Sequence, residues 1–223
     1  MSLANIKLKE NKLPWIRDFS VDSNNKAHWL RVEYTCGCLE EKIREPFPLE
    51  VVISWGKSLL GQLKEMSTNK LYLGEISPKN LFITEGNMLK IFPLNQAKAV
   101  SMTEKLAKSE TVDPKAIFDE PYLPPEYSSL KALNAGMIEK IEVYQFGLLM
   151  YQLLAASSRL MLKCHKEEKD FARNTLEASA SIRPGDNQRS IKTLAAIVQE
   201  CIYEDPGQRS TIDNLIICFN TLG

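Results

Sequence analysis

The stretch from Leu71 to Lys98 holds the residues whose types are suited to catalysis. Glu75 carries a carboxylate that could accept a proton, and Lys90 carries an ammonium group that could neutralise negative charge. Asn80 offers an amide oxygen, which alone makes a poor magnesium site because Mg²⁺ is usually held through carboxylate oxygens. We expect Asn80 to tie backbone groups of its loop together. Glu75 is expected to be a solvated loop carboxylate rather than a base.

The cysteines and histidines form no recognisable metal-binding pattern. Cys36 and Cys38 are separated by one residue, which is too close for a zinc knuckle or a comfortable disulfide. The five cysteines include no CxxC pair, so we expect buried free thiols in a reducing compartment. His28 lies in a strand-like run and His165 in a charged stretch, and both are expected at the surface.

The composition is that of a globular protein with no strong charge bias. The 223 residues are 44% hydrophobic and 25% charged, and 28 basic residues balance 28 acidic ones. A neutral chain has no bulk basic field to attract nucleic acid or an anionic membrane. The longest apolar run, Phe146 to Ala156, is too short to span a bilayer, and residues 1–10 lack a signal-peptide core. We therefore expect a cytoplasmic protein that binds neither nucleic acid nor membrane.

The hydrophobic patterns predict few strands at the front of the chain and helices behind them. Two strands joined by the turn DSNNK are expected in residues 13–35, and a short helix follows within 36–45. Apolar residues at helical spacing predict a long buried helix over 48–70. The strands NLFIT and MLKIF form a hairpin, and a proline-containing loop covers 95–126. Further helices are predicted near residues 138–157, 163–179, 189–204 and 210–222.

Five landmarks in this order resemble the eukaryotic protein kinase fold. EISPKN (75–80) is similar to D-L-K-P-x-N, and PPE (124–126) to A-P-E. EVYQFGLLMYQLL (142–154) is similar to D-V-W-S-F-G and its helix, and CIYEDPGQRSTIDNL (201–215) to C-x-x-x-D-P-x-x-R-P-T. HWLRVEYTCGCLEEKI (28–43) resembles the fifth strand, the hinge and the first C-lobe helix.

The resemblance covers residues 12–223 and implies an α+β, protein kinase-like fold. It assigns residues 1–35 to a reduced β N-lobe and residues 36–223 to a mostly α-helical C-lobe. The hinge would consist of Glu33, Tyr34, Thr35 and Cys36.

Three further residues match structural positions of the family. Glu126 and Arg209 match a buried ion pair between the activation segment and the loop before the last helix. Glu142 takes the place of an aspartate that caps the central helix and holds the catalytic-loop backbone.

The chemical positions of the family are mostly replaced. LGE, ending at Glu75, stands where the family has H-R-D, and Ser77 stands where it has a lysine. Pro93 and Asn95 occupy the places of the aspartate and glycine of D-F-G. No G-x-G-x-x-G and no V-A-I-K-like lysine precede the hinge. Because phosphoryl transfer depends on positioning and charge neutralisation, we expect no bound metal, no nucleotide cofactor and no catalysis.

Three functions are compatible with this pattern. The first is a catalytically inactive pseudokinase that binds another protein, such as an active kinase, or a neighbouring domain of a longer chain, as a scaffold or allosteric regulator. The second is an atypical protein kinase with displaced catalytic residues, for which Lys90 and Glu75 are the candidates. The third is a nucleotide-sensing domain that accepts adenine at the hinge. The first is favoured, because fold-holding positions persist where chemical ones are lost.

Two surfaces are candidates for binding a partner. One combines the C-lobe helices with the segment around Phe118, Tyr122 and Tyr127, whose aromatic side chains either meet a partner or pack down as anchors. The other is an open edge of the strand at residues 27–32, which would favour a homodimer through strand pairing.

Overall fold

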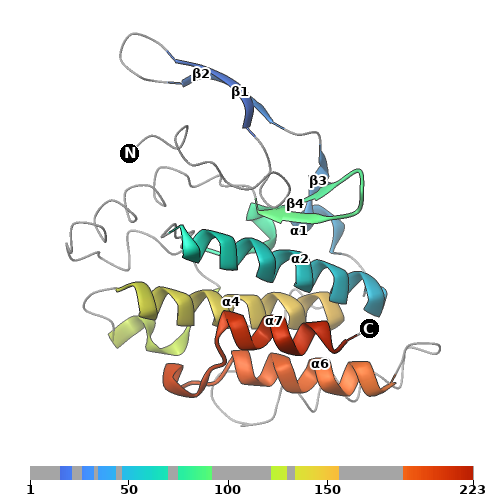
Figure 1. Ribbon diagram of the computed structural model, residues 1–223, viewed down its shortest axis with the longest axis vertical. Coiled ribbons are helices and arrows are strands. Elements are labelled where there is room, and N and C mark those ends of the chain that lie inside the picture. Colours follow the sequence, from blue (N-terminus) through green and yellow to red (C-terminus); the bar gives the residue numbers. More distant parts are fainter. Residues whose placement is uncertain are drawn as a thin grey trace.

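The computed structural model describes residues 16–21, 27–32, 35–43, 47–69, 75–91, 122–129, 134–155 and 188–222. The described strands form two small antiparallel sheets. Strands β1 (Ile16–Val21) and β2 (Ala27–Val32) make a hairpin. The second sheet has the order β3-β4-β5, with bounds Thr35–Cys38, Leu81–Thr84 and Leu89–Ile91. Figure 1 shows the β1–β2 hairpin at one end of the molecule, away from the stacked helices.

Helices make up most of the described chain. They are α1 (Leu39–Lys42), α2 (Leu49–Thr68), α4 (Ala135–Ala155), α6 (Gln188–Cys201) and α7 (Ile212–Asn220). Short 3₁₀ helices occur at η2 (Pro78–Asn80), η4 (Pro125–Ser129) and η6 (Pro206–Gln208). No described helix has both the length and the apolar character needed to cross a membrane.

The hydrophobic core lies between α2, α4, α6 and α7, which stack as layers in Figure 1. Helix α4 is buried along most of its length because it has neighbours on several sides. The rings of Phe146 and Phe219 meet edge to face with their centroids 5.5 Å apart. At Gly147 the backbone of α4 approaches α6 so closely that an added Cβ would lie 2.5 Å from Cys201 Cβ.

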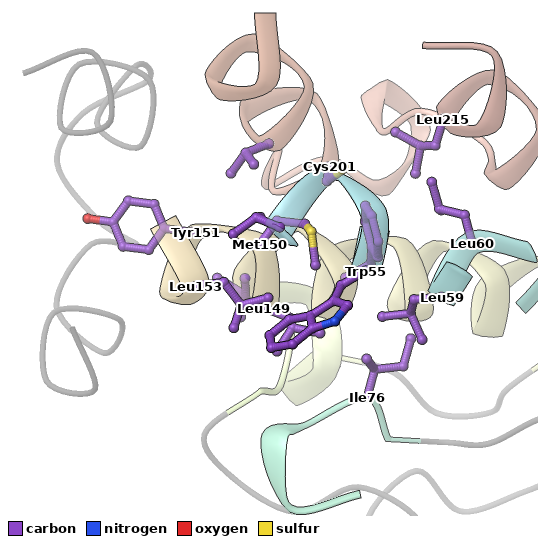
Figure 2. Close-up of a cluster of buried hydrophobic side chains, with 14 of the residues drawn as sticks. Trp55, Leu59, Leu60, Ile76, Leu149, Met150, Tyr151, Leu153, Cys201 and Leu215 are labelled. Carbon is purple, nitrogen blue, oxygen red and sulfur yellow. The ribbon is translucent and has the colours of Figure 1, made fainter. Parts of the chain in front are cut away.

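The β4–β5 hairpin is fixed to α2 at its turn. Asn87 takes the left-handed conformation with φ of 54°, a conformation that asparagine tolerates better than most residues. The indole Nε1 of Trp55 donates a hydrogen bond of 2.8 Å to the Asn87 carbonyl oxygen. Trp55 itself is buried in the core cluster (Figure 2).

The α+β class with a mostly helical C-terminal part is confirmed, and the differences lie mainly at element boundaries. Residues 36–38 belong to strand β3 and do not start a helix, because Cys38 pairs with Phe82 of β4. Helix α4 begins earlier than predicted, where the Asn134 side chain accepts a hydrogen bond from the Met137 amide. Helix α7 begins later, because Thr211 caps it. The helix predicted at 163–179 lies outside the described residues.

Candidate functional site

The loop that carries Glu75 is packed against α4. Glu75 is 6% exposed, so the prediction of a solvated carboxylate is wrong. The reason lies in the next residue: the Ile76 amide donates a 2.9 Å hydrogen bond to Gln145 Oε1 of α4. The Ile76 side chain is 1% exposed and points into the hydrophobic cluster (Figure 2). These two anchors hold the neighbours of Ile76, Glu75 and Ser77, below the surface.

Ser77, Pro78 and Asn80 after Ile76 are buried too, whereas Lys79 is exposed. Ser77 is 1% exposed, and its hydroxyl has no hydrogen-bond partner among the described residues. The Asn80 amide donates to the Ser77 carbonyl at 3.0 Å and closes the turn η2. The Cys38 thiol donates to the Pro78 carbonyl at 3.2 Å, which ties the turn to β3. The role expected of the Asn80 side chain stays a prediction.

Strand β5 is held by a buried glutamine that the sequence did not single out. Gln62 Nε2 donates to the Leu89 carbonyl at 2.8 Å, and Gln62 Oε1 accepts from the Ile91 amide at 3.0 Å. Its side-chain amide therefore pairs with β5 much as the backbone of a further strand would. Ser58 adds a 3.1 Å hydrogen bond from its hydroxyl to the Leu89 carbonyl. Gln62 is completely buried, so these hydrogen bonds fix β5 firmly on α2.

Lys90 lies between Leu89 and Ile91, the two residues of β5 that bond to Gln62. Leu89 and Ile91 are buried at the α2 side, and alternation along the strand turns Lys90 toward the opposite face of the sheet. There it pairs in register with Phe82, which in turn pairs with Cys38. Lys90 is 5% exposed, so its charge is not displayed to solvent.

The expected ion pair between Glu126 and Arg209 is present. Both guanidinium Nη atoms donate to the carboxylate, at 2.7 and 2.6 Å, in a bidentate arrangement. The Arg209 side chain is fully buried, and its guanidinium lies 4.7 Å from the ring centre of Tyr144. Its other donors bind backbone carbonyl groups, those of Lys140, Tyr203 and Glu204. Arg209 thereby joins η4, α4 and the loop before α7.

Tyr122 is a buried residue, so the prediction that it offers an exposed aromatic surface is wrong. Its ring is 6% exposed, and its hydroxyl donates a 2.6 Å hydrogen bond to Gln152 Oε1 of α4. Burial raises the pKa of this hydroxyl well above its ordinary value, and the negative charges of Glu40 and Glu75 raise it further. Tyr122 packs down as an anchor, which was the other of the two roles expected for it.

Helix α4 carries a line of buried polar residues. Glu142, Gln145 and Gln152 recur at helical spacing within an otherwise apolar helix, and all three are buried. Gln145 holds the Ile76 amide and Gln152 holds the Tyr122 hydroxyl. The role expected of Glu142 as holder of the loop backbone stays a prediction, whereas Gln145, one turn further along, does hold it.

Comparison with known proteins identifies the family. The family model described as protein tyrosine and serine/threonine kinase matches residues 8–219. The chain belongs to this kinase family. It is also similar to the LysM domain receptor-like kinase 10 of Oryza sativa subsp. japonica, with 24% identity over 164 residues. The match covers 66% of this chain and 26% of the relative, so the chain spans about a quarter of the relative's length.

Several kinase positions lie outside the described residues. Pro93, Asn95, Glu33, Tyr34 and the aromatic Phe118 are among them. Thr35 and Cys36, assigned to the hinge, belong to strand β3, which pairs with β4. The hinge assignment and the lobe boundary at residue 35 therefore stay predictions.

Three kinase positions within the described residues have a clear chemical character. Glu75 and Ser77, which match the catalytic-base and lysine positions of the family, are both buried, and burial together with the charges of Glu40 and Glu75 raises the pKa of the Tyr122 hydroxyl. Within the described ranges, no three His, Cys, Asp or Glu side chains gather closely enough to hold a metal ion. The described contacts fix loops: they join the residues around Ile76 and Tyr122 to α4, and the β4–β5 hairpin to α2.

Proposed function

We propose that this kinase-family domain is a pseudokinase: it transfers no phosphoryl group and acts through binding. The observation that carries the proposal is the burial of Glu75, which is 6% exposed at the catalytic-base position. A general base must come within hydrogen-bond reach of the hydroxyl that it deprotonates. A carboxylate enclosed between the catalytic loop and its neighbours does not offer that reach to a peptide substrate.

The residues present do not fit a magnesium nucleotide. Pro93 stands at the metal position and has no side-chain oxygen, whereas Mg²⁺ requires hard oxygen ligands. Ser77, at the lysine position, carries no positive charge and is 1% exposed. Positioning of the phosphates and neutralisation of their charge are the main contributions of a kinase to phosphoryl transfer. We therefore derive no transfer step for this chain.

A binding role is supported by the contacts that hold the fold together. The Glu126–Arg209 pair holds the described residues 122–129 in place, and the two hydrogen bonds of the Gln62 side chain to β5 hold the β4–β5 hairpin. A rigid C-lobe of this kind presents a constant surface to a partner. We propose that the partner is another protein, such as an active kinase, or a neighbouring domain, since the chain matches about a quarter of a longer receptor-like kinase.

The thiols support a reducing compartment. Cys36, Cys38, Cys201 and Cys218 are all free, but only Cys201 is buried as expected: Cys38 and Cys218 are half-buried and Cys36 is exposed. Exposed free thiols persist where cellular reductants keep them reduced. We propose that this domain works in the cytoplasm.

The strand β2 supports a homodimer as one form of the binding role. Among the described strands β2 pairs with β1, and its other edge has no described partner strand. Unpaired edges readily accept a strand of another chain. Sedimentation equilibrium that shows a strict monomer at high protein concentration would remove this part of the proposal.

Thermal unfolding with nucleotides tests the inactive-kinase proposal. ATP, ADP and each with Mg²⁺ are added at a concentration well above that needed by active kinases, and the melting temperature is recorded. We expect no magnesium-dependent rise. A ligand at 100 times its Kd stabilises by about 2.7 kcal/mol, which corresponds to about 5–10 °C for a chain of this size. A rise of that size with ATP and Mg²⁺ would contradict the proposal.

A further inference from the structure

We propose that Cys36 and Cys38 of strand β3 form a two-coordinate binding site for Cu(I), a soft monovalent cation. Each thiol releases its proton to water and forms one sulfur–copper bond, and copper keeps its oxidation state. The site goes beyond the proposed function and does not depend on it, because copper binding at these thiols requires neither a nucleotide nor catalysis.

The covalent spacing of the two cysteines is the first argument. One residue separates them, so their Cα atoms are at most about 7.6 Å apart, twice the distance between consecutive Cα atoms. Two thiolates that share one metal ion lie about 4–5 Å apart, since a metal–sulfur distance is about 2.3 Å. Side chains on such closely spaced Cα atoms can both reach one ion.

The ligand set is the second argument, because it decides which metal fits. A structural zinc ion takes four ligands, and within the described ranges no three His, Cys, Asp or Glu side chains gather closely enough to hold a metal ion. Thiolates are soft ligands and select soft cations such as Cu(I), which is satisfied by two of them. The spacing that argues against a zinc knuckle therefore suits copper.

The backbone between the thiols is bent and accessible. Gly37 has φ of 117°, a conformation that favours glycine, and the pairing of β3 with β4 shifts register between Thr35 and Cys38. Such a bulge re-aims side chains that regular alternation would hold in place. A Cβ added to Gly37 would meet only the ends of two flexible side chains of the described residues, Glu41 Oε2 and Lys42 Cε, each at 3.6 Å.

The surroundings of the two thiols suit the capture of a soft cation. Cys36 is exposed, so a copper donor can reach it, whereas Cys38 is half-buried. The ammonium group of Lys42 is one bond beyond its Cε, and its charge offsets that of a copper dithiolate. The nearby Glu41 carboxylate is a hard ligand that competes poorly for Cu(I).

Copper binding also changes a contact of the turn η2. The Cys38 thiol donates to the Pro78 carbonyl at 3.2 Å and to the Lys79 carbonyl at 3.5 Å, and a copper-bound thiolate has no proton to donate. The same turn is closed by the Asn80 amide, which donates to the Ser77 carbonyl at 3.0 Å. Copper at Cys38 therefore loosens the tie between β3 and η2, and the Asn80 amide exchanges faster.

Anaerobic titration with Cu(I) against the chromogenic chelator bicinchoninate tests the site on the full chain. We expect one tightly bound Cu(I) per chain, and an affinity about 100- to 10,000-fold lower in Cys36→Ser and in Cys38→Ser, the gain that a second ligand on a short linker provides. Cys36→Ser changes an exposed side chain and so retains the fold. The control variant Cys164→Ser/Cys218→Ser keeps both thiols of β3 and should bind Cu(I) as the wild type does.

Two further readouts separate this site from copper bound at any surface thiol. X-ray absorption should show two sulfur ligands for each copper. Hydrogen exchange at the Asn80 amide should quicken when Cu(I) is added to the wild type but not to Cys38→Ser, while the Ile91 amide, bonded to Gln62, stays unchanged.

Three results would overturn the copper site. The first is an affinity of either single serine variant equal to that of the wild type, and the second is a loss of affinity in the Cys164→Ser/Cys218→Ser control. The third is a copper ion with one sulfur ligand, or one whose binding leaves exchange at the Asn80 amide unchanged. No readout uses a nucleotide, so the copper site can fail while the inactive-kinase proposal stands, and the reverse.

Discussion

Replacing Gln62 by leucine measures how firmly α2 holds strand β5. Leucine is an apolar residue of comparable size that cannot form side-chain hydrogen bonds, so the substitution fills the site and removes the polar pairing. It abolishes the 2.8 Å hydrogen bond to the Leu89 carbonyl and the 3.0 Å hydrogen bond from the Ile91 amide. Because Gln62 is completely buried, water cannot replace either partner without opening the core.

The expected cost follows from which backbone group is left without its acceptor. The Leu89 carbonyl keeps the Ser58 hydroxyl at 3.1 Å, whereas the Ile91 amide loses the acceptor on the α2 side. Leaving one buried polar group unsatisfied costs about 1–3 kcal/mol. We therefore expect the free energy of unfolding to fall by about 1–3 kcal/mol, and the melting temperature to fall by about 2–4 °C for each kcal/mol.

Urea unfolding followed by circular dichroism measures the effect, with the midpoint expected to fall at an unchanged slope. Ser58→Ala is the matched control. It removes the hydrogen bond from the Ser58 hydroxyl to the Leu89 carbonyl, while the hydrogen bonds of Gln62 to β5 remain. Its cost is expected to be smaller, about 0.5–1.5 kcal/mol. A Gln62→Leu variant as stable as the wild type would contradict the view that the Gln62 side chain holds β5 on α2. So would a variant whose loss of unfolding free energy is no larger than that of Ser58→Ala.

Three further predictions concern other interactions of the described residues. Glu126→Gln leaves the fully buried Arg209 side chain without its counter-ion. We expect the free energy of unfolding, measured by urea titration, to fall by about 3–5 kcal/mol. A loss below about 1 kcal/mol would contradict a stabilising buried pair. Gly147→Ala places a methyl group 2.5 Å from Cys201 Cβ and should cost about 1–3 kcal/mol by overpacking; an unchanged melting temperature would show that α4 and α6 separate easily. Because the pKa of Tyr122 is raised in the folded state, its contribution to stability is complete below pH about 10 and is lost as the pH rises further. Tyr122→Phe should therefore lose less stability between neutral and strongly alkaline pH than the wild type, and an equal loss would contradict this.

Helices and hairpins that are encoded by local sequence patterns could be predicted from the sequence alone. Helix α2 was predictable because Val52, Trp55 and Leu59 recur at helical spacing, and the structure buries all three. The β4–β5 hairpin was predictable from a short glycine-containing turn between two strand-like runs. The ion pair of Glu126 and Arg209 was predictable through the kinase resemblance, since matched motifs fix positions far apart in the chain.

Contacts between distant segments were not predictable from local patterns. Glu75 was expected in solvent because a loop carboxylate usually lies there, and its burial depends on a hydrogen bond between Ile76 and Gln145, far apart in the sequence. The glutamines Gln62 and Gln152 look like ordinary helical residues until their partners are placed beside them. The one usable signal was their position within strongly apolar helices, where a buried amide needs hydrogen-bond partners.

The most direct test of the central claim is transfer of radiolabel from ATP labelled in its γ-phosphate. The purified chain is incubated with Mg²⁺ or Mn²⁺ and a general protein substrate, beside a Glu75→Gln variant. We predict that the wild type gives no more label, on itself or on the substrate, than Glu75→Gln gives. Label that is incorporated by the wild type and lost in Glu75→Gln would contradict the account, because it would make the buried carboxylate a working base.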